Sequence, residues 1–247
     1  MKALVLTHDR CRRVTEHMLK TYAIHWPNNQ FIFRIPYQQN RNLNAYGLKY
    51  EFIQTNNGIK DTVIELLKGL PDDEWIYWCM DDKFLIAIDQ ESATYFTEWV
   101  EKLSDPKVGG VSFCRARRLF LSNTVDETPA FRTERGDALL LRRNYNQIWL
   151  HQFLKVRVVR HLFESFPDSS FIAREMDKFK DAMSVPLDSN LYVTEKNYVV
   201  FGESTIYGKL TQGCLMSMQN LSIEVPEGIE LIDKNVVIGS LGSIVGS

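Results

Sequence analysis

The feature that most constrains the fold of this chain is an aromatic, apolar run that ends in two adjacent carboxylates. Every residue of 75–80 is apolar, and Asp81 and Asp82 follow directly. Continuous apolar character, as opposed to alternation, is typical of a strand buried on both faces. Ligands bind at the carboxyl edge of open α/β sheets, so the two aspartates are candidate ligand-binding groups. The alternative is a β-turn that carries two solvated aspartates.

The segments before this run predict an alternation of strands and helices. We expect strands at 2–7, 30–35, 50–54 and 75–80, and helices at 11–24 and 59–70. The helices are inferred from apolar residues at helical spacing, and Pro36 is expected to stop the second strand. The first 86 residues therefore read β-α-β-β-α-β. This order predicts an α/β fold with a mostly parallel central sheet and helices on both faces.

The second half of the chain is less regular. We expect a helix at 89–103, a strand at 108–114, a polar loop at 123–136, a strand at 138–141, helices at 144–159 and 171–183, and a hairpin formed by 191–194 and 197–201. We find no internal repeat and no linker in the sequence. One domain spanning 1–247 is therefore predicted.

Composition excludes several classes of protein. A formal net charge of −2 provides no electrostatic basis for binding nucleic acid or an anionic membrane surface. The four cysteines are far apart and argue against a zinc ribbon and a disulfide framework. Neither a signal-peptide core nor a transmembrane segment is evident, so a cytoplasmic protein is expected. The chain lacks the glycine-rich motifs of P-loop ATPases and dinucleotide-binding enzymes.

The order of these segments resembles the nucleotide-diphospho-sugar glycosyltransferases of the GT-A fold, which is related to the Rossmann fold. The resemblance is carried by Thr7-His8-Asp9-Arg10 after the first strand, by Asn56-Asn57-Gly58 before the helix at 59–70, and by Trp75-Ile-Tyr-Trp-Cys-Met-Asp-Asp82. The last segment matches the family's strand that ends in an Asp-x-Asp-like motif, although Met80 occupies the first motif position. The resemblance implies a nucleotide-binding half, 1–115, and a smaller, irregular acceptor-side half, 116–247.

The resemblance also implies an activity. Such an enzyme moves a sugar from a nucleoside-diphosphate sugar (a UDP- or GDP-sugar) to a hydroxyl of a carbohydrate or other acceptor. A divalent cation, Mn²⁺ or Mg²⁺, can bridge the two phosphates and absorb the charge of the leaving diphosphate. Asp82 is the predicted metal ligand. Asp81 is expected to bind ribose or donor-sugar hydroxyls, or to reach the metal through water.

Further candidates for binding the nucleotide sugar follow the first and third strands. They are Thr7, His8, Asp9, Arg10, Asn57 and Lys60. The Asp9 carboxylate is expected to accept a hydrogen bond from a pyrimidine N3–H or a ribose hydroxyl. The alternative for Thr7 and Asp9 is a helix N-cap, and a solvated first turn explains Lys60 equally well.

The acceptor side offers weaker signals. In inverting members of the family a carboxylate acts as general base toward the attacking hydroxyl, and Glu175 and Asp177 are the candidates by chain order. A surface salt-bridge ladder is their alternative. Arg115 and Arg117 are candidates to meet a phosphate or an acidic acceptor, with a solvated basic edge as the alternative.

Trp26 and Trp149 are candidates to line a sugar cleft, and core packing is the alternative for both. Two other functions stay open. One is a nucleotidyltransferase built on the same sheet, although those enzymes usually carry a glycine-rich loop after the first strand, where this chain has no glycine. The other is a catalytically silent protein that binds nucleotides or carbohydrates.

Overall fold

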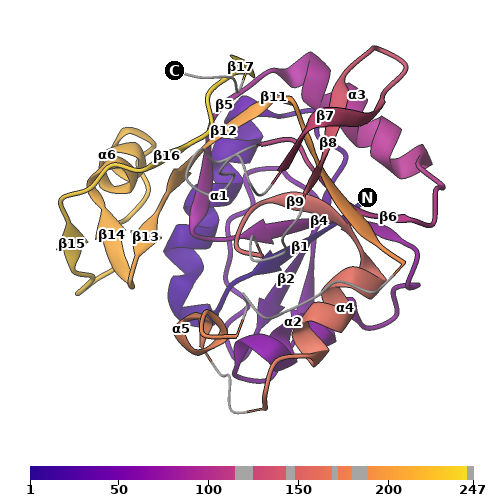
Figure 1. Ribbon diagram of the computed structural model, residues 1–247. Coiled ribbons are helices and arrows are strands. Elements are labelled where there is room, and N and C mark those ends of the chain that lie inside the picture. Colours follow the sequence, from indigo (N-terminus) through magenta and orange to yellow (C-terminus); the bar gives the residue numbers. More distant parts are fainter. Residues whose placement is uncertain (115–124, 143–147, 169–171, 180–187, 244–247) are drawn as a thin grey trace.

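The structure is a computed structural model that describes residues 1–114, 125–142, 148–168, 172–179 and 188–243. In the described part of the chain, a nine-stranded sheet forms the centre of the molecule (Figure 1). In order across the sheet, the strands are β3 (Tyr50–Gln54), β2 (Ile32–Tyr37), β1 (Lys2–Leu6), β4 (Trp75–Met80), β9 (Gln152–Lys155), β6 (Val108–Ser112), β10 (Asn190–Thr194), β8 (Ala138–Arg142) and β7 (Val125–Arg132).

Most strands of this sheet point the same way. β9 is antiparallel to both β4 and β6, and β8 is antiparallel to both β10 and β7. The other neighbouring pairs are parallel. Within the described residues, all strands of the sheet except β8 and β9 therefore share one direction. The predicted α/β class with a mostly parallel central sheet is confirmed.

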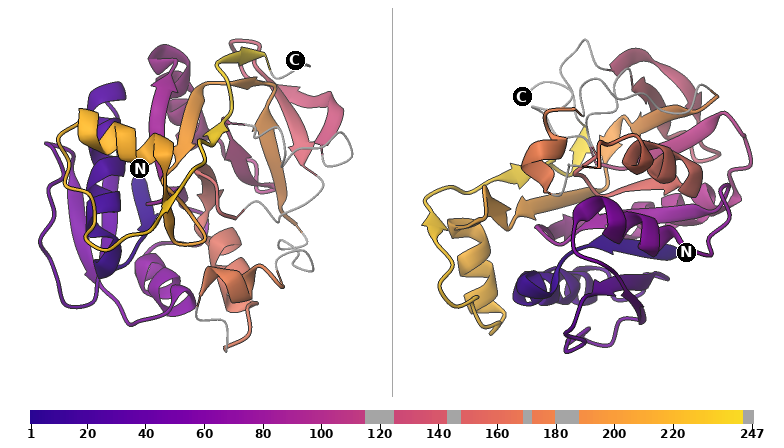
Figure 2. Two further views of the ribbon diagram at one scale, coloured as in Figure 1. Left: turned by 90° about the vertical axis from the view of Figure 1, so that its left-hand side faces the viewer. Right: turned by 90° about the horizontal axis from the view of Figure 1, so that it is seen from below.

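Helices cover both faces of the sheet. They are α1 (Arg12–His25), α2 (Ile59–Leu67), α3 (Gln90–Lys102), α4 (Val156–Glu164), the short α5 (Ala173–Met176) and α6 (Gln212–Asn220), with a 3₁₀ turn η1 (Asp9–Cys11) before α1. Buried side chains of α1 and α3 pack on one face, and those of α2 and α4 pack on the other. Figure 2 shows α1 on the opposite side of β1 from α2 and α4.

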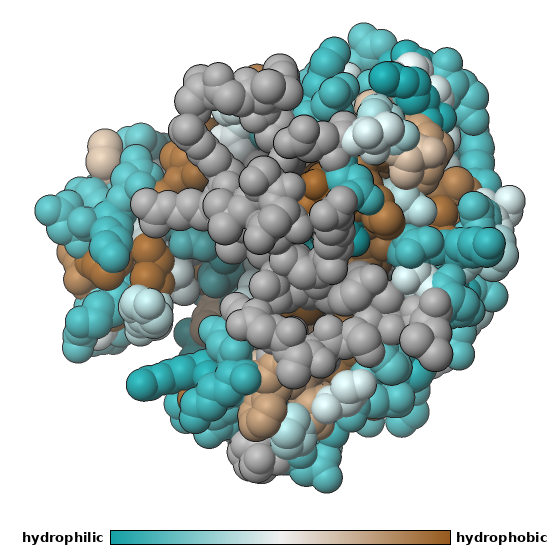
Figure 3. Space-filling view, in the orientation of Figure 1, coloured by the Kyte–Doolittle hydropathy of each residue, from teal (hydrophilic) through white to brown (hydrophobic). Residues whose placement is uncertain are grey.

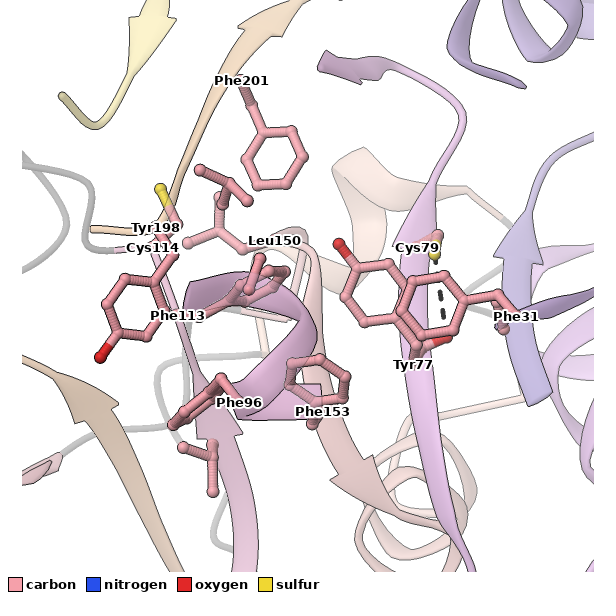
Figure 4. Packing of buried hydrophobic residues seen from close by; sticks show 14 of the residues in the cluster. Phe31, Tyr77, Cys79, Phe96, Phe113, Cys114, Leu150, Phe153, Tyr198 and Phe201 are labelled. Atoms are coloured by element: carbon pink, nitrogen blue, oxygen red, sulfur yellow. Dashed lines mark hydrogen bonds between the residues drawn. The ribbon is translucent and has the colours of Figure 1, made fainter. Parts of the chain in front are cut away.

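β4 explains why the sequence run before Asp81 is apolar throughout. Its odd-numbered side chains, from Trp75 to Cys79, belong to the core under α1 and α3, where Tyr77 stacks on Phe31 with ring centroids 4.5 Å apart (Figure 4). Its even-numbered side chains, from Ile76 to Met80, belong to the core under α2 and α4. A central strand with helices on both faces has no polar face, as the sequence predicted.

Smaller sheets extend the molecule beyond the acidic pair. β5 (Lys83–Ile88) pairs with β12 (Val199–Glu203), which also pairs with β16 (Val237–Ile238). A separate lobe consists of α6 and the strands β13 (Thr205–Ile206), β14 (Lys209–Thr211) and β15 (Leu231–Ile232). β11 (Lys196–Asn197) pairs with β17 (Gly242–Ser243). In the described residues, none of the helices is both apolar enough and long enough to cross a membrane.

Several sequence predictions in the second half are wrong. The polar segment 123–136 contains the strand β7, whose polar composition and Pro129 suit the edge of a sheet. The segment predicted as a helix at 144–159 contains β9, and α4 begins only at Val156. Because β9 is buried between β4 and β6, its apolar residues carry no period that separates a strand from a helix.

The predicted hairpin of 191–194 and 197–201 is also wrong. β10 pairs with β6 and β8 in the central sheet, whereas β12 pairs with β5 and β16. Pro36 does not stop the second strand but lies inside β2, opposite Ile53. The helix expected at 171–183 is described only over 172–179, where α5 is a single turn followed by a non-helical turn.

Candidate functional site

Most of the predicted site residues that follow strands gather at one edge of the sheet. The parallel register places Leu6 of β1 beside Met80 of β4, and Tyr37 of β2 beside Gln54 of β3. The residues that follow these strands therefore meet at the carboxyl edge, where open α/β sheets bind ligands. Figure 1 shows this edge at the left of the sheet, on the side where α5 and the lobe of α6 lie.

Asp81 is held at this edge by the residue that follows β1. Thr7 Oγ1 donates to Asp81 Oδ2 over 2.6 Å, and the same hydroxyl lies 2.7 Å from Thr15 Oγ1. Burial and the neighbouring Asp82 raise the pKa of Asp81 to about 7, although Thr7 and nearby cations oppose the shift. Two adjacent carboxylates thus form the centre of the edge, and their mutual repulsion contributes to the raised pKa of Asp81.

Asp82 is paired with a buried lysine. Lys83 Nζ lies 2.9 Å from Asp82 Oδ1 and 3.3 Å from Glu203 Oε1, and the lysine side chain is 5% exposed. Burial lowers the pKa of Lys83, but the two carboxylates raise it further, so the net shift is upward. The amide of Ser204 also donates to the carbonyl of Asp82 over 2.7 Å. The turn expected by the alternative reading is present, and it joins β4 to β5.

A buried histidine fixes the backbone just before the acidic pair. His151 Nε2 lies 2.8 Å from the carbonyl oxygen of Met80, and His151 Nδ1 lies 2.8 Å from the Tyr22 hydroxyl. Burial lowers the pKa of His151 to about 3, so the ring is neutral and carries one N–H. The carbonyl can only accept, so Nε2 donates to Met80, and Nδ1 accepts from Tyr22. Tyr22 in turn accepts from the Tyr77 hydroxyl, 2.7 Å away.

His8 and Asn57 connect the ends of β1 and β3. The amide of Arg10 donates to His8 Nδ1 over 3.1 Å, so His8, and neither Thr7 nor Asp9, caps the short helix η1. Because Nδ1 accepts, the ring hydrogen lies on Nε2, which donates to Asn57 Oδ1 over 3.2 Å. Asn57 precedes Gly58, whose φ of 103° is readily adopted by glycine where the chain enters α2.

A polar pocket lies beside this bridge. Its volume is about 440 Å³, and it is lined by Gln38, Gln39, Gln54, Thr55, Asn56, Asn57 and Glu65. All but Glu65 belong to the segments at the carboxyl ends of β2 and β3. Amide side chains supply both donors and acceptors, so the pocket suits a flat, polar heterocycle.

Asp9 holds one wall of this pocket in place. Its Oδ2 accepts from the amides of Gln38, Gln39 and Asn40 at 2.7 to 3.2 Å, and its Oδ1 accepts from Arg12 Nη2 at 2.6 Å. Burial alone would raise the pKa of Asp9, but these donors outweigh it and lower the pKa. The carboxylate is therefore ionised and engaged in ordering the loop after β2.

The remaining predicted residues have other neighbours. Arg10 is exposed at the same edge, whereas Lys60 Nζ donates to the carbonyl of Phe166 and to Asp168, which joins α2 to the segment after α4. Glu175 lies on α5, and Asp177, just after it, accepts from Trp149 Nε1 over 2.8 Å. Trp26 is buried in the core, and the run that contains Arg115, Arg117 and Arg118 lies outside the described residues.

Sequence reasoning missed three contributors to this edge, namely Lys83, Glu203 and His151. Lys83 is visible beside Asp82 in the sequence, but its burial is not. Glu203 and His151 come from distant segments that only strand pairing brings to the edge. The polar residues after β2 could have been found by the same strand-end rule that singled out Thr7 and Asp81.

Comparisons with known proteins give distant structural similarities only. No protein-family model matches the chain, and no curated protein matches its sequence. One similar solved structure is TarS 1–349 of S. aureus, with 14% sequence identity over 80% of this chain and a TM-score of 0.47. A second is the galactosyltransferase LgtC in complex with donor and acceptor sugar analogs, with 10% identity over 74% of this chain and a TM-score of 0.39. A third is 4-diphosphocytidyl-2C-methyl-D-erythritol synthase from Anaerococcus prevotii, with 11% identity over 90% of this chain and a TM-score of 0.43.

The matched regions cover 59%, 66% and 97% of those three chains, respectively. The chain thus spans less than two thirds of the TarS structure that it matches. A galactosyltransferase and a 4-diphosphocytidyl-2C-methyl-D-erythritol synthase are both among these structures.

Proposed function

We propose that this protein is a glycosyltransferase that moves a sugar from a nucleoside-diphosphate sugar, a UDP- or GDP-sugar, to a hydroxyl of a carbohydrate or other acceptor. One observation carries the proposal: a pocket lined with amides and a pair of adjacent carboxylates lie at the same edge of the sheet. A nucleotide sugar has a flat, polar base at one end and a charged diphosphate near the other. The amides suit the base, and the carboxylates would suit the diphosphate through a divalent cation bound between them.

In the proposed complex the base occupies the pocket of about 440 Å³ beside Asn57. The ribose and diphosphate then extend past His8 toward Asp81 and Asp82. Arg10 is exposed at this edge and supplies a positive charge for the phosphates. Asp9 acts on the nucleotide through the loop that its carboxylate orders. In this arrangement the residues after β1 bind the donor in two ways: Arg10 contacts the phosphates directly, and Asp9 orders the loop beside the base.

A divalent cation, Mn²⁺ or Mg²⁺, is proposed to bind at Asp82, with Asp81 beside it. The described residues contain no group of three or more His, Cys, Asp or Glu side chains arranged to hold a metal. Mg²⁺ needs only one or two carboxylates, with water and phosphate completing its shell, so the acidic pair fits such an ion. Burial and then the charge of Asp82 raise the pKa of Asp81, and a bound cation would offset the repulsion between the two carboxylates. When bound, the ion supplies charge for the leaving diphosphate.

The residues of the chain perform the other tasks. Thr7 orients Asp81, Lys83 orients Asp82, and His151 fixes the carbonyl of Met80 immediately before them. Positioned groups of this kind stabilise charge without reorganising during the reaction.

We propose Glu175 or Asp177 as the general base that accepts the proton of the acceptor hydroxyl. Trp149 donates to Asp177 and holds this carboxylate. A carboxylate that is held in position within reach of the acceptor hydroxyl can accept its proton.

Thermal unfolding with nucleotides tests the proposal. UDP, GDP and CDP are added with and without Mn²⁺ or Mg²⁺, and at least one is expected to raise the melting temperature. A ligand at one hundred times its Kd stabilises by about 2.7 kcal/mol. Asp82→Asn should lose the metal-dependent part of the shift. Asp72→Asn is the matched control, since Asp72 lies before β4, at the opposite edge, and pairs with Arg160. A flat response of the wild type to every nucleotide contradicts the proposal.

Product analysis separates the alternatives. A glycosyltransferase transfers the sugar of a UDP- or GDP-sugar to an acceptor, or slowly to water, and releases the nucleoside diphosphate. A nucleotidyltransferase releases inorganic diphosphate from a nucleoside triphosphate and a sugar phosphate. Binding without either product identifies a silent binding protein.

A further inference from the structure

The lobe beside the acidic pair ends in a tight hairpin with an unusual residue at its tip. β13 and β14 pair in the register Thr205 with Leu210 and Ile206 with Lys209, so the loop consists of Tyr207 and Gly208. Both have positive φ angles, 52° for Tyr207 and 77° for Gly208. These are the features of a type I′ turn, whose first position favours Asn, Asp or Gly.

Neither the turn nor the core explains a tyrosine at this position. Tyrosine is disfavoured in the left-handed region, where its Cβ approaches the backbone. The side chain is 93% exposed, so it contributes almost no buried apolar surface in return. A strained backbone conformation that the fold does not need points to a function for the residue that adopts it.

The base of the hairpin is attached to the acidic pair. The Ser204 amide donates to the carbonyl of Asp82 over 2.7 Å, and Glu203 shares the buried Lys83 with Asp82. Tyr207 lies three residues after Ser204, which places it roughly 10 Å along the strand from that contact. Figure 3 shows a notch between the lobe of α6 and β13–β15 and the body of the molecule below it.

The lobe holds the hairpin firmly. Leu210 packs with Phe84, Cys214 and Met218 in a buried cluster. The Leu210 amide also donates to the carbonyl of Glu230 over 2.8 Å, and the Thr211 hydroxyl caps α6. The ring of Tyr207 is thus presented to solvent by a rigid support, which lowers the entropy lost when it binds a partner.

We propose that Tyr207 is an acceptor-binding residue whose ring stacks on a pyranose of a carbohydrate acceptor. The inference rests on the proposed function, since it selects a carbohydrate among the possible hydroxyl acceptors. An aromatic ring offers an apolar face to the C–H groups of a sugar, and its hydroxyl offers a hydrogen bond. The position suits an acceptor because the hairpin starts at the donor-side carboxylates and extends away from them.

Saturation-transfer NMR with the methyl glycosides of glucose, galactose, mannose and N-acetylglucosamine tests the inference. At least one glycoside is expected to bind the wild-type protein. Tyr207→Asn removes the ring and suits the turn, so it should bind that glycoside roughly tenfold more weakly while melting at the wild-type temperature or above. Tyr207→Phe keeps the ring and should retain most of the binding. Met216→Ala, on exposed α6 surface of the same lobe, is the matched control.

Two results overturn the inference: no glycoside binds the wild type, or Tyr207→Asn binds as well as the wild type. Thermal shifts with UDP and GDP on the same variants keep this test separate from the proposed function. Tyr207→Asn should leave those shifts unchanged. If nucleotides fail to stabilise any variant while glycoside binding still depends on Tyr207, the donor site is refuted and the sugar-stacking site stands.

Discussion

Two polar networks meet at the end of β4, and they differ in how completely their groups are satisfied. The network of Tyr77, Tyr22 and His151 is buried and neutral, and it ends at the carbonyl of Met80. The network of Asp81, Asp82 and Lys83 begins one residue later and is charged, with the two carboxylates partly accessible to solvent. The first network has the properties of a structural support. The second contains carboxylates whose negative charge a bound ligand or cation can neutralise.

The largest expected effect is the dependence of the free energy of unfolding on pH. Burial lowers the pKa of His151 to about 3, and it lowers to about 4 the pKa of His17, which lies outside both networks beside Ser217 and Cys214. An unfolded histidine titrates near 6.5. Below pH 6.5 these histidines bind protons in the unfolded state but not in the folded state. Their contribution to the free energy of unfolding therefore falls as the pH falls toward 4. The two histidines together contribute a loss that approaches about 2.7 kcal/mol per pH unit. Asp81 offsets about half of it, because its raised pKa lets the folded state bind a proton before the unfolded state does. Urea denaturation from pH 7 to 4.5 measures the net slope.

His17→Gln should remove most of the net slope, because the remaining contributions of His151 and Asp81 have opposite signs and nearly cancel. An unchanged slope in this variant would show that other groups govern acid unfolding.

Removing one carboxylate tests the charged network. Asp82→Asn should lower the rate of sugar transfer by about 10² to 10³, the effect typical of losing one electrostatic group at a reacting centre. Its stability should change much less, because Glu203 still pairs with Lys83. Steady-state assays with UDP- or GDP-sugars measure the rate, with Asp72→Asn as control. Wild-type turnover in Asp82→Asn would remove this residue from the site.

Lys83→Met tests whether the buried lysine also supports the fold. Asp82 and Glu203 would then face each other without a cation, and both are partly solvated. We expect a destabilisation of about 2–3 kcal/mol, below the 3–5 kcal/mol typical of fully buried pairs. Urea denaturation at pH 7 measures the change. A neutral or stabilising result would show that Lys83 is retained for the chemistry of the site alone.

The smallest effect is expected in the neutral network. Tyr77→Phe removes one hydroxyl, while Tyr22 still donates to His151. The stability should fall by about 1 kcal/mol, and nucleotide binding should stay at the wild-type level. Melting curves with and without UDP or GDP report both quantities. Lost nucleotide binding at wild-type stability would assign this network to the ligand site as well.

The first half of the sheet and the candidate donor edge could be predicted because their signals are local. The run 75–80 is apolar throughout since β4 is covered on both faces, and the residues after β1 and β4 meet because parallel strands end at one edge. The polar residues after β2 are visible in the sequence, but their place in a pocket depends on the Asp9 carboxylate, which lies 29 residues earlier than Gln38.

The second half could not be predicted because its strands pair over long distances. β9 enters between β4 and β6, and β12 pairs with β5, yet neither pairing leaves a local pattern in the sequence. The same pairings bring His151, Glu203 and the hairpin of Tyr207 to the carboxylates.

The sequence by itself thus determined that a doubly buried strand ends in Asp81 and Asp82, because side-chain burial follows from the periodicity of neighbouring residues. Only the tertiary structure decided which groups surround those carboxylates. Their partners, Lys83 excepted, come from segments far away in the chain, and such contacts depend on strand pairing that local periodicity does not encode.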